Sequence, residues 1–211
     1  MSLSTWLLYV AAVLVLTVTP GPSVLMCVST SVNLGARKGL VVALGSTTAI
    51  VGIMVLSALG LGAALAASET LFAALKWLGV AYLAYLGLSA LLSLDQEIGV
   101  AGSGASQGPS QRRLWTQGFG VGASNPKALL FFGALFPQFI TLDAPRLPQF
   151  LVLGATFVFF ELFWLTVYTL LAARAKGWLQ RPGRARLFNR LTGWVFLVAA
   201  GVLAGSKRGA G

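Results

Sequence analysis

The stretch Val18–Leu25, VTPGPSVL, places two prolines and a glycine inside an apolar segment that runs from Leu3 to Val28. Proline has no backbone N–H and clashes with the preceding helical turn, so Pro20 and Pro22 remove helical hydrogen bonds. Lipid cannot replace those bonds, and irregular backbone at membrane depth is tolerated only where protein or a cavity covers it. The stretch therefore predicts a helix that is broken near its middle and presents free backbone groups.

The rest of the chain has the composition of an integral membrane protein. Of its 211 residues, 57% are hydrophobic and 9% are charged. Soluble proteins have fewer hydrophobic and more charged residues than this. A spanning helix needs roughly 20 apolar residues. The segments that meet this requirement are 3–30, 39–67, 71–94, 115–140, 148–172 and 187–205. We expect an all-α fold with six transmembrane helices, the first retained rather than cleaved as a signal because it has no charged n-region.

The net charge of +10 is concentrated in three connections, around Arg37 and Lys38, around Arg112 and Arg113, and over 174–190. With six spans these connections share one side of the membrane. The positive-inside rule makes that side cytoplasmic, so both termini are expected outside. The charge is thus a topology signal, with the lipid bilayer rather than nucleic acid as its partner.

Metal and redox chemistry are not expected. Cys27 is the single cysteine and the chain has no histidine, so an internal disulfide is excluded and ligands for soft metals are scarce. We expect no cofactor and no metal site. An enzyme would need a nucleophile with a base or a metal, and the sequence does not predict one.

A linker rich in glycine, serine and glutamine divides the chain into two parts. It covers residues 95–113, leaving three predicted helices in 1–94 and three in 114–211. A flexible cytoplasmic connection is typical of such composition. Because each part has an odd number of spans, the second must insert inverted relative to the first, as in many secondary transporters.

Internal similarity supports this division. LKWLGVAYLAYLG at 75–87 aligns without gaps with NRLTGWVFLVAAG at 189–201, and TPGPSVL aligns with ASNPKAL so that Pro22 matches Pro126. We predict two inverted three-helix repeats whose leading helices are broken at Pro20–Pro22 and at Asn125–Pro126. Such breaks present backbone groups to a substrate near the midplane. The alternative is that they are kinks that serve packing alone.

Two charged residues, Lys127 and Glu161, fall deep within predicted spans. A charge at the bilayer centre costs about 2.5–3.5 kcal/mol on insertion scales. Such residues therefore usually form ion pairs or take part directly in the function of the protein. One interpretation is a structural ion pair. The other is a zwitterion site, in which Lys127 and the freed amides near Pro22 and Pro126 hold a carboxylate, while Glu161 holds an ammonium or exchanges a proton.

The candidate site residues follow from these patterns. The predicted substrate-binding residues are Pro20, Gly21, Pro22, Ser23, Asn125, Pro126, Lys127, Glu161 and Tyr168, and Glu161 is also the predicted proton-coupling residue. Tyr168 shares a helix face with Trp164 and Glu161, where packing is its main alternative role. The glycine pairs expected to serve close helix packing are Gly118 with Gly122 and Gly201 with Gly205.

The segments TPGPSVL, NLGARKGL, LKWLGVAYLAYLG, SNPKALLFFGALFPQFI and the helix containing Glu161 resemble the LysE/RhtB family of amino-acid exporters. The resemblance covers nearly the whole chain in order. It implies a six-helix inner-membrane protein that expels amino acids such as lysine, homoserine, threonine, cysteine or leucine, driven by the proton gradient. The functional positions that the resemblance implies are the two helix breaks and Glu161, where relatives often carry aspartate. Some relatives have an ionisable group in the second helix, where this chain has Ser46–Ala49; the difference disfavours a strongly charged substrate side chain.

We therefore expect an exporter of neutral or hydroxylated amino acids from the bacterial cytoplasm, working by proton antiport and alternating access. The alternatives are an exporter of an amino-acid derivative or a cation and, from other classes, a non-transporting scaffold or a membrane enzyme. A divalent cation would want several oxygen ligands, and one buried acid is visible. The small-residue faces also suggest a homodimer. Neither the amino acid nor the stoichiometry follows from the sequence.

Overall fold

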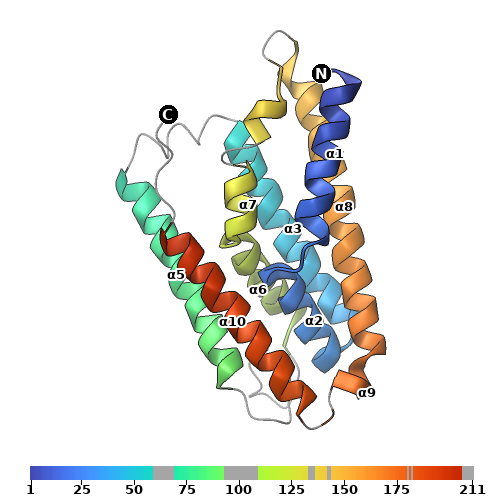
Figure 1. The fold of residues 1–211 in the computed structure, drawn as a ribbon, viewed down its shortest axis with the longest axis vertical. Helices are drawn as coiled ribbons and strands as arrows, with labels where there is room; N and C mark the ends of the chain where they lie inside the picture. Colours follow the sequence, from blue (N-terminus) through green and yellow to red (C-terminus); the bar gives the residue numbers. More distant parts are fainter. Residues whose placement is uncertain are drawn as a thin grey trace.

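The computed structural model is all-helical within the residues that it describes, which are 1–58, 69–92, 109–132, 136–141, 144–179, 181 and 183–205 (Figure 1). The helices in chain order are α1 (Leu3–Val18), α2 (Pro22–Leu34), α3 (Ala36–Ala58), α5 (Glu69–Leu91), α6 (Gln111–Ala123), α7 (Pro126–Leu130), the 3-10 helix η2 (Phe136–Phe139), α8 (Arg146–Arg174), α9 (Lys176–Leu179) and α10 (Arg184–Gly205).

Three helices in the described part of the chain are long and apolar enough to cross a membrane, namely α3, α8 and the Arg186–Gly205 part of α10. Helices α1 and α2 make a fourth candidate span when they are taken together, bent by 46° at their break. Two of the predicted spans are shorter in the structure. The span predicted over 71–94 corresponds to the apolar part of α5, Lys76–Leu91, and the span predicted over 115–140 is divided into α6 and α7. Six spans therefore go beyond what the described helices establish by length and composition.

The predicted break in the first segment is confirmed. Helix α1 ends at Val18 and α2 begins at Pro22, with Gly21 as its N-cap residue. Proline suits this first helical position because the N–H that it lacks would have no partner inside the helix. Before the break, the backbone N and the Oγ1 of Thr19 both donate to the carbonyl oxygen of Val15, at 3.3 and 2.6 Å. The last turn of α1 is thus closed, and the chain restarts in a new direction.

The second predicted break is confirmed in the same form. Helix α6 ends at Ala123 and α7 begins at Pro126. Asn125 is the N-cap residue, and its Oδ1 accepts a hydrogen bond from the backbone N of Lys127 at 3.1 Å. Both breaks are therefore helix starts with proline in the first turn, rather than kinks within a continuous helix.

Helix α3 packs along α6 at very short range. A Cβ atom added to Gly118 would lie 2.1 Å from the carbonyl oxygen of Val42, and one added to Gly122 would lie 2.5 Å from that of Ser46. Any side chain at these positions would push the helices apart, so the predicted packing role of Gly118 and Gly122 is confirmed. The two contacts also show that α3 and α6 run in the same direction.

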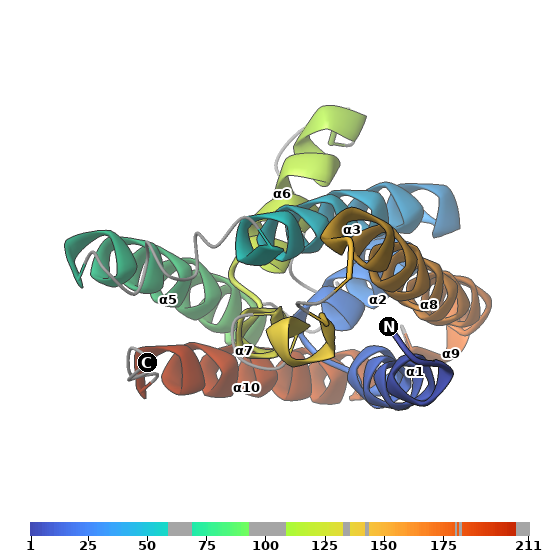
Figure 2. The same cartoon turned by 90° about the horizontal axis from the view of Figure 1, so that it is seen from above.

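The second predicted glycine pair does not pack against the part of the chain that the structure describes. A Cβ atom added to Gly201 or Gly205 would meet nothing within 4 Å. Helix α10 instead approaches α5 through Gly193, whose added Cβ would lie 2.9 Å from the carbonyl oxygen of Gly87. Figure 2 shows α5 and α10 lying side by side, to one side of α3 and α8. The repeated G-x₃-G spacing alone did not reveal which face of α10 meets its neighbour.

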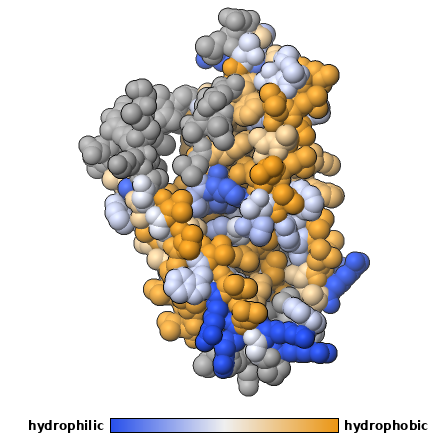
Figure 3. Space-filling model, in the orientation of Figure 1, coloured by the Kyte–Doolittle hydropathy of each residue, from blue (hydrophilic) through white to orange (hydrophobic). Residues whose placement is uncertain are grey.

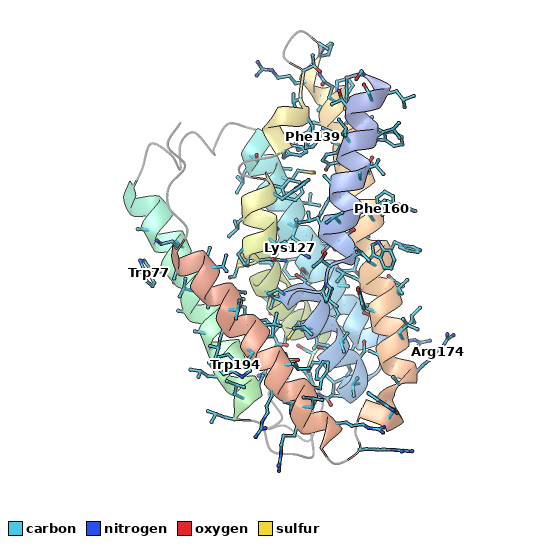
Figure 4. The ribbon with its side chains drawn as sticks, in the orientation of Figure 1. Trp77, Lys127, Phe139, Phe160, Arg174 and Trp194 are labelled. Atoms are coloured by element: carbon cyan, nitrogen blue, oxygen red, sulfur yellow. The ribbon has the colours of Figure 1, made fainter. Side chains whose placement is uncertain are left out.

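The predicted basic connections lie at one end of the bundle. Because α3 and α6 run parallel, Arg37 and Lys38 near the start of α3 lie at the same end as Arg112 and Arg113 in α6. Helix α8 runs antiparallel to α3 and ends there at Arg174, which Figure 4 labels. Figure 3 shows hydrophilic side chains at this lower end, apolar surface above it, and a smaller hydrophilic patch at mid-height.

The predicted linker falls largely outside the described residues. Of the range 95–113, only 109–113 are described, and α6 already begins at Gln111. Ser110 caps this helix, since its side chain accepts from the backbone N of Arg113 at 3.3 Å. The second half thus begins its first helix a few residues earlier than expected.

Candidate functional site

Lys127 lies in the first turn of α7, at mid-height of the bundle and beside the end of α1 (Figure 4). Its Nζ donates to the carbonyl oxygens of Leu16 and Thr19, at 2.5 and 2.7 Å. The last carbonyls of a helix lack intrahelical partners and carry partial negative charge. The ammonium of the second break is therefore bound to the helix end of the first break.

Tyr168 on α8 closes the same helix end. Its hydroxyl donates to the carbonyl oxygen of Val18 at 2.7 Å. Trp164 lies one turn away on the same face, and its buried Nε1 has no hydrogen-bond partner. The Tyr168 hydroxyl therefore has the partner that its membrane environment requires, and α8 fixes α1 at its end.

The two breaks are joined by a small polar network. Ser23 Oγ, in the first turn of α2, lies within hydrogen-bond distance of Asn125 Nδ2 at 3.3 Å and of Ser46 Oγ, from α3, at 2.8 Å. All three side chains are at most 3% exposed. Ser23 and Asn125, predicted separately beside different breaks, are in direct contact.

The N-terminus of α2 has no side-chain cap. Its N-cap residue is Gly21, so no side chain accepts from the first-turn N–H groups. A Cβ added to Gly21 would lie 3.6 Å from Lys127 Nζ. An ammonium has three hydrogens, of which the two bonds to α1 use two. The third N–H and the positive end of α2 together form a place that stabilises an anion.

Glu161 is 8% exposed and lies on the buried face of α8 with Phe157, Leu165 and Thr169. It interacts electrostatically with Lys127 and with the Cys27 thiol of α2. Among the described residues it has neither a hydrogen bond nor an ion pair, and the lysine is bound to α1 instead. The ion pair considered from the sequence is thus not formed in this conformation.

Of the predicted site residues, Gly21, Lys127 and Tyr168 lie around the end of α1. Ser23 and Asn125 join the two breaks, and Glu161 interacts electrostatically with Lys127. Pro20 is the exposed member, and it serves to end α1 rather than to line the interior. The others are buried or half-buried, and they are Gly21, Pro22, Ser23, Asn125, Pro126, Lys127, Glu161 and Tyr168.

Some contributors to the site were not singled out from the sequence. Ser46 was one of several hydroxyls in the second segment, and no sequence signal pairs it with Ser23. The carbonyl groups of Leu16 and Thr19 could have been found from the sequence, because a broken helix must leave its last carbonyls without intrahelical partners. A buried lysine elsewhere in the chain was the natural donor to satisfy them.

These features define a membrane protein with a polar site inside a bundle of apolar helices. The family model "LysE type translocator" matches residues 14–207, and the chain belongs to this family. It is a multi-pass membrane translocator and not an enzyme. The resemblance that the sequence motifs indicated is thereby confirmed.

Similar proteins extend over nearly the full length of the chain. A homoserine/homoserine lactone efflux protein of Salmonella typhimurium is 32% identical over 98% of this chain and 99% of its own. An uncharacterized membrane protein of Vibrio cholerae is 31% identical over 98% of this chain and 100% of its own. A leucine efflux protein of Enterobacter is 29% identical over 93% of both chains. No solved structure matches the chain.

Proposed function

We propose that this chain exports neutral or hydroxylated amino acids of the homoserine type from the bacterial cytoplasm, by antiport with protons. The observation that carries the proposal is that Lys127 and Glu161 both lie inside the bundle without being bonded to each other. Charges are costly inside a membrane protein. Two opposite charges held apart there suit a ligand that carries the complementary pair, and a zwitterionic amino acid carries it.

The chemistry of the two ends assigns a role to each. The third N–H of Lys127 and the uncapped N-terminus of α2, beginning at Gly21 and Pro22, are suited to the substrate carboxylate. Glu161 is suited to the ammonium. Ser23 and Asn125 hold the two breaks against each other, so they fix the spacing of these elements.

The names of the relatives support Glu161 as the main anchor. Homoserine, homoserine lactone and leucine all carry an α-ammonium group, whereas the lactone has no free carboxylate. The ammonium is thus the group that the compounds named for these separate relatives share, which favours it as the group that a common site recognises. Homoserine lactone is thus a second candidate substrate, and unlabelled lactone should compete with homoserine for exchange.

Proton coupling follows from the same carboxylate. Glu161 can hold an ammonium or a proton, and a buried acid left with neither is unfavourable. Alternate occupation by substrate and proton, on opposite sides of the membrane, then exchanges one for the other. This is the simplest antiport that a site with one buried acid can perform.

Alternating access would use six spans arranged as two inverted repeats, 1–94 and 114–211, joined by the linker at 95–113. Three features of the packing support this architecture. Helix pairs α1/α2 and α6/α7 are both broken before a proline. The second helix of each half packs on the broken pair of the other half, α3 on α6 and α8 on α1 and α2. The third helices of the two halves, α5 and α10, pack on each other. We place the basic end in the cytoplasm and both termini outside the bacterial inner membrane.

The test is the Glu161→Gln variant in proteoliposomes loaded with radiolabelled homoserine. Glutamine keeps the size of the side chain and leaves the bonds of Lys127 to α1 untouched, so a folded protein is expected. Transport driven by a pH gradient should be lost, while exchange of internal for external homoserine should persist in part with a raised KM, because the glutamine amide oxygen still accepts a hydrogen bond from the substrate ammonium. Continued accumulation in response to a pH difference would contradict the proton-carrier role. A wild-type protein that moves no amino acid would contradict the function itself.

A further inference from the structure

The facing residues of α3 and α8 are fixed by contacts near both ends. Near one end, a Cβ added to Gly154 would lie 2.8 Å from Met54 Cε; near the other, a Cβ added to Gly39 would lie 3.0 Å from Thr169 Cγ2. Met54 follows Gly39 by fifteen residues, as Thr169 follows Gly154. The two helices therefore run antiparallel with equal spacing between their contacts.

This register places Thr47 opposite Glu161. Thr47 lies seven residues before Met54, and Glu161 lies seven residues after Gly154. Seven residues are about two helical turns, so both side chains return to the face that carries the Met54 contact. Thr47 and Glu161 thus occupy the same level on facing helices.

Thr47 is one of four described threonines, with Thr30, Thr169 and Thr192, whose buried hydroxyl has no hydrogen-bond partner, and in this it differs from the adjacent Thr48. The Oγ1 of Thr47 is buried and has no partner, and the residue is 5% exposed. The hydroxyls of Thr17, Thr48 and Thr156 each donate to the carbonyl oxygen four residues earlier, at 2.8 Å. That bond is how a threonine usually satisfies itself in a membrane helix. The neighbouring Ser46 is bonded to Ser23, so Thr47 is the hydroxyl in this turn that is left for a ligand.

We propose that Thr47 Oγ1 and the Glu161 carboxylate together hold the ammonium group of the exported amino acid. This rests on the proposed function and adds a residue to its site. An ammonium donates three hydrogen bonds; the carboxylate accepts one or two, and the threonine oxygen accepts another. When a proton replaces the substrate, Glu161 becomes a carboxylic acid, and its O–H can donate to the same threonine oxygen. Thr47 therefore serves both occupied states of the site.

The experiment compares three variants by exchange of radiolabelled homoserine in proteoliposomes. Thr47→Val removes the hydroxyl at nearly constant volume, and KM should rise about tenfold, as for the loss of one bond to a charged group. Thr47→Ser retains a hydroxyl and should stay within about threefold of the wild type. Thr48→Val is the matched control, since the adjacent hydroxyl is exposed and bonded to its own helix; its KM should not change.

A thermal unfolding measurement in detergent separates binding from stability. Thr47→Val removes a buried polar atom that has no partner, so the unfolding temperature should be unchanged or higher. A lower unfolding temperature, or a KM within twofold of the wild type, would overturn the role of Thr47. Either result leaves the proposed function standing as long as the wild-type protein exchanges homoserine.

Discussion

The Nζ atom of Lys127 lies 2.7 Å from the carbonyl oxygen of Thr19, although the two residues are 108 positions apart. The lysine that begins α7 thereby closes the end of α1, and it does so beside Gly21 at the start of α2. A carboxylate that draws on this ammonium competes with the carbonyls of α1. In the proposed function, substrate binding and the position of α1 are therefore linked through the Lys127 side chain.

Replacing Lys127 by methionine tests this link. The change leaves the carbonyls of Leu16 and Thr19 without their donor, so we expect the free energy of unfolding to fall by about 1.5–3 kcal/mol, the range for hydrogen bonds to charged groups. Homoserine exchange should be lost. The matched control is Lys76→Met, since Lys76 Nζ donates to the carbonyl oxygen of Ala204 at 3.2 Å, away from the breaks. A Lys127→Met protein with wild-type exchange would contradict the assignment.

The Tyr168 hydroxyl allows a gentler test of the same helix end. Tyr168→Phe removes one neutral hydrogen bond, to Val18, and should cost about 0.5–1.5 kcal/mol of stability. We also expect slower exchange, because the end of α1 is less well fixed. Tyr82→Phe is the control: its hydroxyl donates to the carbonyl oxygen of Gln117 at 3.2 Å, so stability should fall similarly while exchange stays normal. Equal effects of both variants on exchange would argue against a special role of the α1 end.

Much of the site could be predicted from local chemistry. Proline fixes where a helix can start, so Pro22 and Pro126 located both breaks without any knowledge of packing. Asparagine directly before a proline is a typical N-cap, and Asn125 has that role. Buried charges stand out in an apolar chain, which identified Lys127 and Glu161.

The rest depended on contacts between distant segments. The partners of Lys127 are carbonyl groups, which have no sequence signature. Thr47 could not be distinguished from Thr48, because the register of α3 against α8 depends on the Met54–Gly154 and Gly39–Thr169 contacts. For the same reason the spacing of Gly201 and Gly205 predicted a packed face where the structure has an open one.

The two glycine pairs predict opposite outcomes for the same substitution. Gly118→Ala places a Cβ 2.1 Å from the carbonyl oxygen of Val42, which is backbone and cannot rotate away. We expect a loss of at least about 1–3 kcal/mol, as for overpacking, and low abundance in the membrane. Gly201→Ala meets nothing within 4 Å and improves helix propensity, so it should be neutral or slightly stabilising. Thermal unfolding of the purified variants measures both, and similar values would contradict the close packing of α3 on α6.

The proposed orientation can be measured by labelling with a membrane-impermeant thiol reagent. Cys27 is buried and should not react, so the native chain serves as background. A cysteine in place of Ser2 should be labelled in intact spheroplasts, whereas one in place of Arg181 should be labelled only after the membrane is opened. Both positions are exposed. The reverse pattern would place the basic end outside the cell.

The contact between Gly87 and Gly193 joins α5 to α10, and these helices come from different halves of the sequence. Rocking one half against the other as rigid blocks would shear this backbone contact, while a motion that carries both helices together would preserve it. We therefore expect the moving unit to differ from the predicted three-helix repeat. In the proposed transport cycle we expect α5 and α10 to move together as a two-helix arm against the remaining helices.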